Sequence, residues 1–302
     1  NRMKIKIEEK IKESQNGFRP GRGTTDAIFI VRQIMEKARE RKIDLHFNFV
    51  DFNSKFDTIW RNALWIILRS ISVENKIVNI IEQLYEETEC AVVTNGHITR
   101  WFEVTVGVRQ GCILSPTLFN VFLEFVMDDL KSLQDNLQLD EILSNDIRHA
   151  DDTTLISMVF DKLHISTNEL EASCAKLGIS SDQNYIKIDG KVVEKVKEFT
   201  FLGSVVPGTP SDIKRRISLA SSAFGRLKQK VWSNRNITVQ LKIRLYYALI
   251  VPIAIYASET WTLLAEDERK LQAFEMRCLR TILGVSLRDH IRNEKIRKLL
   301  NI

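Results

Sequence analysis

The sequence IRHADDTTLI, residues 147–156, places two adjacent acids, Asp151 and Asp152, between two short apolar segments. This pattern predicts a β-hairpin centred on the two acids. Adjacent carboxylates in a tight turn repel each other, so they are costly unless a cation neutralises them. Mg²⁺ prefers such carboxylate oxygens together with phosphate oxygens. The pair is therefore either ordinary turn chemistry, in which Asp is common, or part of a metal site.

A third acid, Asp51, ends a predicted strand in which Leu45, Phe47 and Phe49 alternate. Two metal ions bridged by acids from neighbouring strands are the usual arrangement for phosphoryl transfer. Asp57, six residues further on, is interpreted as the cap of the following helix rather than as a ligand.

Before residue 211 the remaining sequence patterns predict both helices and strands, and from residue 211 onward they predict helices only. Thr25 and Asp26 are expected to cap a helix whose apolar side chains, over residues 27–38, have helical spacing. Residues 77–85 form a second amphipathic pattern. Asn95-Gly96 and Asp189-Gly190 predict hairpin turns, and Gly178 predicts a helix end.

Further helix starts are predicted from capping residues. Ser115 is expected to cap a helix with Pro116 in its first turn. Ser211 and Thr238 are expected to cap helices in the part of the chain that is helical to its end.

Composition sets broad limits. The chain has 302 residues, of which 44% are hydrophobic and 27% charged, and its formal net charge is +5. This balance is typical of a soluble globular protein, and the mild positive charge is compatible with nucleic-acid binding. The four cysteines lack metal-site spacing and are expected to be reduced, as in an intracellular protein. The apolar run at residues 245–257 is short and contains Pro252, so no contact with a membrane is expected.

Six segments give a stronger signal when they are taken in order. They are QNGFRPGRGTTD (15–26), DFNSKFD (51–57), GVRQGCILSP (107–116), HADD (149–152), FTFLG (199–203) and YASETW (256–261). Together they resemble the motifs of the reverse-transcriptase core of non-LTR (LINE-like) retrotransposons, and the resemblance covers nearly the whole chain. It implies RNA-directed DNA polymerase activity by two-metal nucleotidyl transfer.

The resemblance also implies a fold. The expected class is α+β, in the right-hand polymerase arrangement. Residues 1–44 would be partial fingers, and residues 45–206 a palm whose antiparallel sheet is flanked by helices and carries the catalytic aspartates and the primer grip. Residues 207–302 would be a helical thumb and a post-thumb segment.

By resemblance, Asp51, Asp151 and Asp152 are the catalytic residues and hold two Mg²⁺ ions, for which Mn²⁺ can substitute. Phe56 falls at the position of the sugar gate, which selects deoxynucleotides; an ordinary core Phe is the alternative. Arg109, Gln110 and Gly111 are expected to bind the nucleotide. Arg19 is expected to contact the triphosphate or template, with a solvated loop as the alternative.

Two further regions are expected to contact nucleic acid. Phe201, Leu202 and Gly203 belong to the primer-grip motif. Residues 211–244 contain nine basic residues and one acid, Asp212, and the basic side chains are expected to face outward from a buried apolar stripe. The nine are Lys214, Arg215, Arg216, Arg226, Lys228, Lys230, Arg235, Lys242 and Arg244. Of these, Lys214, Arg215, Arg226 and Lys228 are expected to hold the phosphate backbone.

The implied partners are an RNA template, a DNA primer and deoxynucleoside triphosphates, with action in the nucleus; the oligomeric state is not indicated. Some features depart from the family pattern. His149 replaces an aromatic residue, residues 180–184 stand where a lysine-bearing segment is usual, and the earlier fingers motifs and the endonuclease are missing. These departures predict a truncated or degenerate copy. The alternative function is thus a catalytically inactive remnant that only binds nucleic acid.

Overall fold

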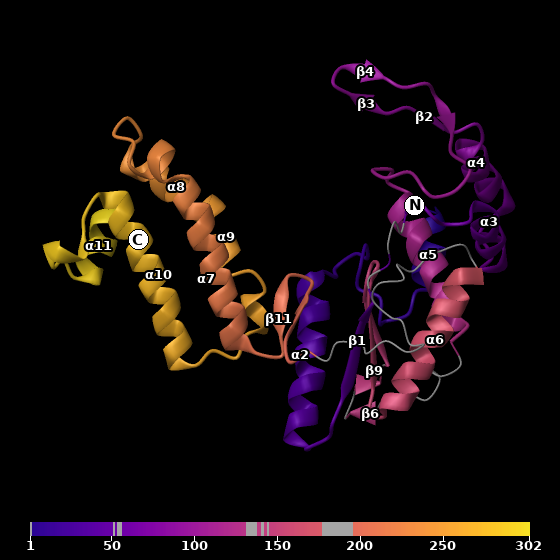
Figure 1. Ribbon diagram of the computed structural model, residues 1–302, viewed down its shortest axis with the longest axis horizontal. Helices are drawn as coiled ribbons and strands as arrows, with labels where there is room; N and C mark the ends of the chain where they lie inside the picture. Colours follow the sequence, from indigo (N-terminus) through magenta and orange to yellow (C-terminus); the bar gives the residue numbers. More distant parts are fainter. Residues whose placement is uncertain are drawn as a thin grey trace. The chain divides into compact units, whose positions relative to one another are not determined.

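The computed structural model describes residues 2–50, 52, 56–130, 138–139, 142–143, 145–176 and 196–302. The chain divides into two compact units, residues 1–195 and 196–302, whose elements are labelled in Figure 1. Asp51, Gly178, the segment 180–184 and the Asp189-Gly190 turn lie outside the described residues.

The first unit mixes helices and short strands. In chain order it contains α1 (Arg2–Glu8), α2 (Thr24–Glu40), β1 (His46–Val50), α3 (Arg61–Ser70), α4 (Asn75–Tyr85), β2 (Glu89–Cys90), β3 (Val93–Thr94), β4 (His97–Ile98), β5 (Phe102–Glu103), α5 (Ser115–Asp128), β6 (Gln138–Leu139), β7 (Ile142–Leu143), β8 (Asp146–His149), β9 (Asp152–Ser157) and α6 (Phe160–Lys176).

A three-stranded antiparallel sheet, in the order β1-β9-β8, is the centre of this unit. The four inner residues of β9 are all buried. Because successive side chains of a strand point to opposite faces, both faces of this strand must be covered. In Figure 1, α2 stands on one side of β1 and β9, and α6 stands on the other.

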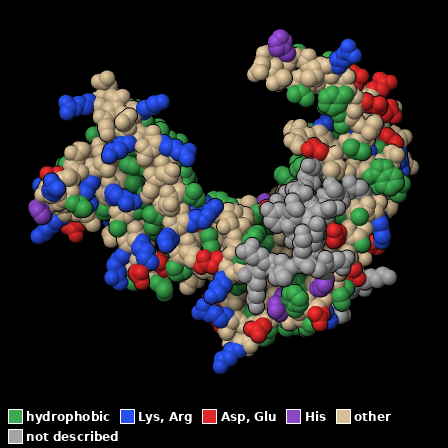
Figure 2. All heavy atoms as spheres, in the orientation of Figure 1, with side chains coloured by type: hydrophobic (Ala, Val, Ile, Leu, Met, Phe, Trp, Pro, Cys, Tyr) green, Lys and Arg blue, Asp and Glu red, His purple; other side chains and the backbone are tan. Residues whose placement is uncertain are grey.

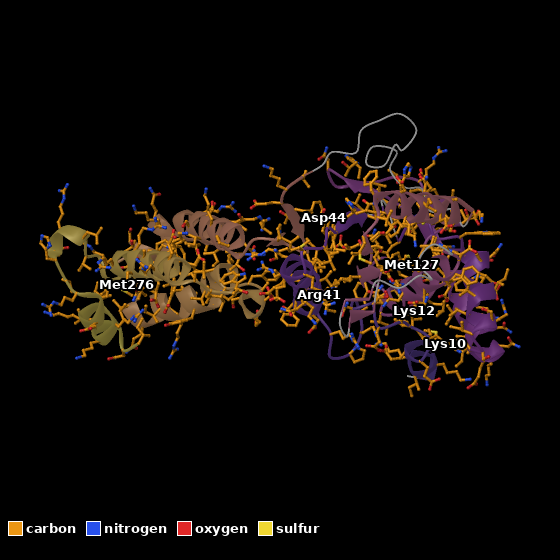
Figure 3. All side chains as sticks on the ribbon, turned by 90° about the horizontal axis from the view of Figure 1, so that it is seen from below. Lys10, Lys12, Arg41, Asp44, Met127 and Met276 are labelled. Carbon is orange, nitrogen blue, oxygen red and sulfur yellow. The ribbon has the colours of Figure 1, made fainter. Side chains whose placement is uncertain are left out.

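The core of the first unit is built largely around α5. This helix is apolar around most of its circumference, so it is buried on nearly all sides, as a central helix should be. Leu118, Phe119 and Phe122 are almost completely buried, and Met127, which Figure 3 labels, also lies in this core. The predicted proline in the first turn of α5 is confirmed.

Several local predictions are confirmed and others are wrong. The turn at Asn95-Gly96 joins β3 to β4, with both residues at positive φ as a tight hairpin turn requires. On α4, Ile81 and Tyr85 are buried as predicted, but Ile80 and Leu84 are exposed. The apolar pattern of this helix is therefore wider than the face that packs.

The predicted caps at Ser115 and Asp57 are wrong. Ser115 is the first residue of α5, and its hydroxyl donates to the Arg109 carbonyl at 2.6 Å. Asp57 lies four residues before α3 and accepts a hydrogen bond from Gln110 instead. In both cases a nearby loop uses the oxygen that the sequence pattern assigned to a helix end.

The second unit is mostly helical. It contains β10 (Phe199–Phe201), β11 (Ser204–Val206), α7 (Thr209–Arg226), η2 (Lys228–Trp232), α8 (Val239–Leu249), α9 (Val251–Ala254), η3 (Ser258–Thr260), α10 (Ala265–Leu283), η4 (Leu287–Asp289) and α11 (Asn293–Leu300).

The helices of the second unit enclose their own apolar core. Phe224 of α7 stacks on Trp232, with ring centroids 4.7 Å apart, and Met276 of α10 is buried in the same core (Figure 3). Thr238 caps α8 as predicted, whereas α7 begins at Thr209, so Ser211 lies inside its first turn. The two cores belong to separate units, as the change from mixed to helical sequence indicated.

Two broad expectations concern the whole chain. Of the helices in the described parts, none has the length and apolar character needed to cross a membrane. All four cysteines are free thiols, as expected, and Cys174 and Cys278 are buried.

Candidate active site

The turn between β8 and β9 carries the two adjacent acids. His149 pairs with Asp152 across the hairpin, so the turn residues are Ala150 and Asp151. The predicted centre at Asp151 and Asp152 is therefore one residue too late. Ala150 has φ 59°, a conformation that costs a residue with a side chain about 1–2 kcal/mol. Such strain persists only where the surroundings hold the backbone in place.

The end of β1 lies next to this turn. Val50, the last residue of β1, pairs with Thr153, the neighbour of Asp152. Asp51 is next in sequence and lies outside the described residues. The strand register therefore agrees with a site formed from β1 and the hairpin, and the role of Asp51 stays a prediction.

The side chains at the β8–β9 turn decide whether a metal ion could bind there. Among the described residues, no group of three or more His, Cys, Asp and Glu side chains is arranged to hold a metal ion. Asp151 and Asp152 supply hard carboxylate oxygens, which suit Mg²⁺. The donor set thus fits a divalent cation, provided that Asp51 completes it.

His149 replaces an aromatic residue beside the acids. Burial lowers the pKa of His149, although the Asp152 and Asp26 carboxylates act in the opposite direction. The ring is therefore neutral at neutral pH and does not place a positive charge beside Asp151 and Asp152.

A buried arginine on β8 ties the hairpin to α5. Arg148 makes two hydrogen bonds to the Glu124 carboxylate, at 3.1 and 3.2 Å, and an ion pair with Asp146 at 2.7 Å. Its side chain also donates to the Ser14 hydroxyl at 2.7 Å. Burial alone would lower the pKa of Arg148, but the Asp146 and Glu124 carboxylates leave it raised. The buried guanidinium is therefore paired on two sides.

Arg19, predicted to bind nucleotide, is engaged within the first unit. Its side chain is buried and donates to the Glu8 carboxylate at 2.6 Å and to the carbonyl oxygens of Lys12 and Gln15 at 2.9 and 3.0 Å. It also pairs with Glu13. In this structure the guanidinium supports the loop that precedes α2.

The loop before α5 brings predicted nucleotide-binding residues from two parts of the chain to one place. The amide of Val108 donates to the Phe56 carbonyl at 2.5 Å, and the Gly107 amide donates to the Ile59 carbonyl at 2.8 Å. A side chain at Gly107 would meet the Asp57 backbone at 2.6 Å, so only glycine permits this approach. Phe56 and residues 109–111 are thus joined although they are far apart in the sequence.

The side chains at this place differ in exposure. Phe56 is half-buried against Phe119, with ring centroids 5.2 Å apart. Gln110 is exposed and donates to the Asp57 carboxylate at 3.1 Å. Gly111 has φ 81° and open space around it. One face of Phe56 is therefore fixed by the core, while Gln110 and Gly111 face solvent.

Arg109 points elsewhere. It donates to the Leu84 carbonyl at 2.8 Å and to the Thr88 hydroxyl at 3.1 Å, and it lies over the Tyr85 ring. This arrangement anchors the loop to the end of α4. Its predicted contact with nucleotide would require these bonds to change.

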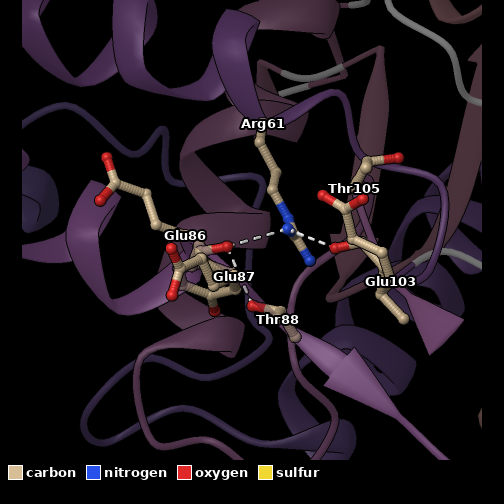
Figure 4. Close-up of a pocket in the computed structure, with 8 residues that line it drawn as sticks. Arg61, Glu86, Glu87, Thr88, Glu103 and Thr105 are labelled. Atoms are coloured by element: carbon tan, nitrogen blue, oxygen red, sulfur yellow. Dashed lines mark hydrogen bonds between the residues drawn. The ribbon is translucent and has the colours of Figure 1, made fainter. Parts of the chain in front are cut away.

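Arg61, which is buried, shapes the loop before α5 as well. Arg61 donates to the carbonyl oxygens of Tyr85, Val104, Val106 and Gly107 at 2.7–3.2 Å. Figure 4 shows the bonds to Tyr85 and Val104. It lines a shallow hollow of about 390 Å³. Three acids, Glu86, Glu87 and Glu103, also line this hollow, so it would repel a nucleotide triphosphate.

The predicted primer-grip hairpin lies in the second unit. β10 and β11 pair antiparallel around the turn Leu202-Gly203, where both residues have positive φ. The Gly203 carbonyl accepts hydrogen bonds from Arg215, at 2.8 Å, and from Arg216. The Leu202 carbonyl accepts one from the Tyr256 hydroxyl at 2.9 Å. Within this motif Phe201 is buried, Leu202 and Gly203 are half-buried, and Phe199 and Thr200 are exposed.

The one acid of residues 211–244, Asp212, is fully buried. Its carboxylate accepts from the Ser204 hydroxyl at 2.6 Å, the Val205 amide at 3.0 Å and the Trp261 indole at 2.9 Å. Consequently no acidic side chain of this segment reaches its surface.

The basic side chains mostly face solvent. Lys214, Arg226, Lys228, Lys230, Arg235 and Arg244 are exposed, and Arg215 is half-buried. The expectation that all nine face outward is wrong for two. Arg216 is buried against the Tyr256 ring, and Lys242 is buried and donates to the Trp232 carbonyl. Figure 2 shows many Lys and Arg side chains and few acids on the visible face of this unit.

Residues 1–206 match the family described as reverse transcriptase (RNA-dependent DNA polymerase). The chain belongs to this family. Over 295 residues, which are 91% of this chain and 32% of the relative, the reverse-transcriptase chain is 21% identical to the RNA-directed DNA polymerase from mobile element jockey of Drosophila funebris. It is 24% identical over 143 residues to the Pol polyprotein from type-2 retrotransposable element R2DM of Drosophila melanogaster, covering 47% of this chain and 13% of that protein. The resemblance predicted from the sequence motifs is thereby confirmed.

A third relative is the Transposon TX1 uncharacterized 149 kDa protein of Xenopus laevis, which is 30% identical over 161 residues. That match covers 52% of this chain and 12% of the relative. The reverse-transcriptase chain thus spans about a third or less of the length of these curated relatives.

Solved structures agree with the mixed fold. Apo telomerase from Candida tropicalis has a TM-score of 0.52 and 16% identity, covering 93% of this chain and 53% of that one. The same telomerase truncated from its C-terminal domain has a TM-score of 0.50 and 18% identity, covering 68% and 42%. At these identities the likeness concerns the fold alone.

Several important residues of this reverse-transcriptase chain were not singled out from the sequence. Glu124, Arg148 and Arg61 form buried networks with partners far along the chain. Gln15 and Asn16 were seen only as part of a motif. The sequence signal that could have found them is a charged residue within an otherwise apolar helix or strand. Such a residue is rarely buried without a partner, so its position indicates a buried ion pair or hydrogen bond.

The Arg148 network yields a stability prediction. Arg148→Met should lower the free energy of unfolding by about 3–5 kcal/mol, because the buried Glu124 carboxylate and the half-buried Asp146 carboxylate would lose the guanidinium that they share. Urea unfolding followed by circular dichroism measures this change.

Arg69→Met is the matched control. Arg69 pairs with Glu82 on the surface at 2.8 Å, and such a pair contributes about 0–1 kcal/mol. Equal effects of the two substitutions would show that the Arg148 network does not stabilise the hairpin.

Proposed function

We propose that this chain is the polymerase part of an RNA-directed DNA polymerase encoded by a mobile element. Residues 1–44 serve as partial fingers, residues 45–206 as the palm and residues 207–302 as the thumb and post-thumb segment. The observation that carries the proposal is the strand register, in which the end of β1 lies beside the turn that holds Asp151 and Asp152. Carboxylates from two neighbouring strands are what two-metal nucleotidyl transfer requires.

Asp51, Asp151 and Asp152 would hold two Mg²⁺ ions. When bound, these ions activate the primer hydroxyl and neutralise the charge of the transferred and leaving phosphates. The chain contributes the position of the carboxylates, which the hairpin and the neutral His149 make compatible with a cation. Deoxynucleoside triphosphates are the substrates in this proposal.

Phe56, Gln110 and Gly111 would form the nucleotide side of the site. The core fixes Phe56 on one face against Phe119, so its ring can exclude a 2′-hydroxyl without moving away. Gly111 leaves room for close approach of a ligand to the backbone. Arg19 and Arg109 act indirectly in this proposal, because their donors hold the surrounding loops.

The second unit would hold the template and primer. The turn Leu202-Gly203 offers the primer grip, and Lys214, Arg215, Arg226 and Lys228 supply positive charge on a segment whose only acid is buried. Contacts to phosphates provide affinity without sequence information. Action in the nucleus, where a mobile element reaches chromosomal DNA, belongs to the same proposal.

Primer extension tests the function. The purified chain should extend an oligo(dT) primer on poly(A) RNA with Mg²⁺ or Mn²⁺ and deoxythymidine triphosphate. Asp151→Asn should abolish extension, because the amide keeps the shape of the side chain but removes the charge that holds a cation. Labelled primer resolved by gel electrophoresis measures the product.

Asp161→Asn, in the exposed first turn of α6, is the matched control and should extend normally. A folded wild-type chain that extends no primer but binds RNA would contradict the proposed activity. That outcome would favour the alternative, a remnant that only binds nucleic acid.

Phe56 yields a specificity prediction. Phe56→Val should reduce the preference for deoxynucleotides over ribonucleotides by roughly tenfold or more, because the smaller side chain leaves space for the 2′-hydroxyl. The ratio of kcat/KM for the two nucleotides measures this preference. Phe29→Val, at an exposed position of α2, should leave the ratio unchanged. An unchanged ratio in Phe56→Val would make Phe56 a core residue only.

A further inference from the structure

The segment that precedes α2 lies against β8 through a single isolated bridge. Gln15 and Arg148 form a parallel bridge. The Asn16 amide donates to the Arg148 carbonyl at 2.7 Å, and the Arg148 amide donates to the Ser14 carbonyl at 2.8 Å. Residues near the start of the chain therefore lie directly against the strand that leads into Asp151 and Asp152.

The side chain of Gln15 holds the turn itself. Its Oε1 accepts a hydrogen bond from the Ala150 amide at 2.8 Å, and its Nε2 donates to the Ala150 carbonyl at 3.1 Å. One side chain thus satisfies both backbone groups of the residue that has the strained positive φ. Gln15 is fully buried, where an amide without these partners would be costly.

The position of Gln15 is itself fixed from two sides. Its Oε1 also accepts from the Gly17 amide at 2.7 Å, and the Gly17 carbonyl accepts from the buried Asn120 side chain of α5 at 2.8 Å. A side chain at Gly17 would meet the Ala150 amide nitrogen at 2.0 Å, so only glycine fits there. A continuous set of hydrogen bonds therefore connects α5, Gln15 and Ala150.

We propose that Gln15 is a positioning residue for the catalytic carboxylates. By holding both the amide and the carbonyl of Ala150, it fixes the backbone from which Asp151 and Asp152 project beside the end of β1. This role rests on the proposed function, in which these acids hold the metal ions. Partners that orient metal ligands typically change metal affinity or activity by 10–100-fold when they are replaced.

Gln15→Met tests the role, because methionine has a similar size and shape but cannot make the three hydrogen bonds. The full-length Gln15→Met chain should bind Mn²⁺ about 10–100-fold more weakly than wild type. Electron paramagnetic resonance measures this binding. Extension should fall by a similar factor, while affinity for poly(A) RNA stays unchanged. Gln33→Met on α2, where the Gln33 side chain donates to the exposed Glu36 carboxylate at 3.3 Å, is the matched control and should behave as wild type.

The outcomes separate this role from simple packing. A lower melting temperature in Gln15→Met with wild-type Mn²⁺ affinity and wild-type kcat would make Gln15 a structural residue and overturn the proposal. A wild-type chain that binds Mn²⁺ through Asp151 but extends no primer would contradict the proposed activity alone. Absence of Asp151-dependent Mn²⁺ binding in the wild type would overturn both.

A measurement on the unaltered chain covers the case in which Gln15→Met does not fold. Amide hydrogen exchange of Ala150, without metal, should be slowed to the level of the paired residues of β9. The Gly96 amide, in the exposed hairpin turn between β3 and β4, is the internal control and should exchange rapidly. Equal exchange rates at Ala150 and Gly96 would show that Gln15 does not hold the turn.

Discussion

The buried polar seam between residues 14–17 and β8 is the constraint on which the first unit depends. It joins the chain before α2 to the hairpin that follows α5, and it is completed by Arg148 with its two carboxylate partners. Buried polar groups stabilise a fold only when all of them are paired. Because these groups have few alternative partners in the core, the seam allows one arrangement of the hairpin.

This arrangement has a chemical consequence. A turn with a strained residue would relax if it were free, and the following acids would then change position. Held between Gln15 and β9, the turn keeps Asp151 and Asp152 beside the end of β1. Catalysis of phosphoryl transfer depends mainly on position and charge, so a rigid support is more useful here than additional reactive groups. The second unit differs in its surface, where most basic side chains of residues 211–244 are exposed while the one acid of that segment is buried.

Sequence predicted the parts of this fold that local patterns determine. The helical spacing of apolar residues over 27–38, the turn at Asn95-Gly96 and the proline in α5 each depend on a few neighbouring residues, and all are confirmed. The predicted caps Thr25 and Asp26 are wrong, because α2 begins at Thr24 and Gly23 occupies the cap position. Partners at long range were not predictable in the same way. Arg216 and Lys242 are basic residues on helices, which usually face solvent, yet both are buried. Each donates a hydrogen bond to a backbone carbonyl, and Arg216 also pairs with Asp212. Gln15 lies 135 residues from Ala150, and nothing in its neighbourhood indicates that partner.

In the proposed function, the hairpin and the end of β1 hold a divalent cation together. Iron(II) can replace Mg²⁺, and with ascorbate and peroxide it cleaves the backbone close to the place where it binds. We expect cleavage at two separate positions, near residue 51 and near residues 151–152, with both lost in Asp151→Asn. Cleavage instead near the acidic rim of Glu86, Glu87 and Glu103, or a pattern that the substitution leaves unchanged, would contradict this proposal.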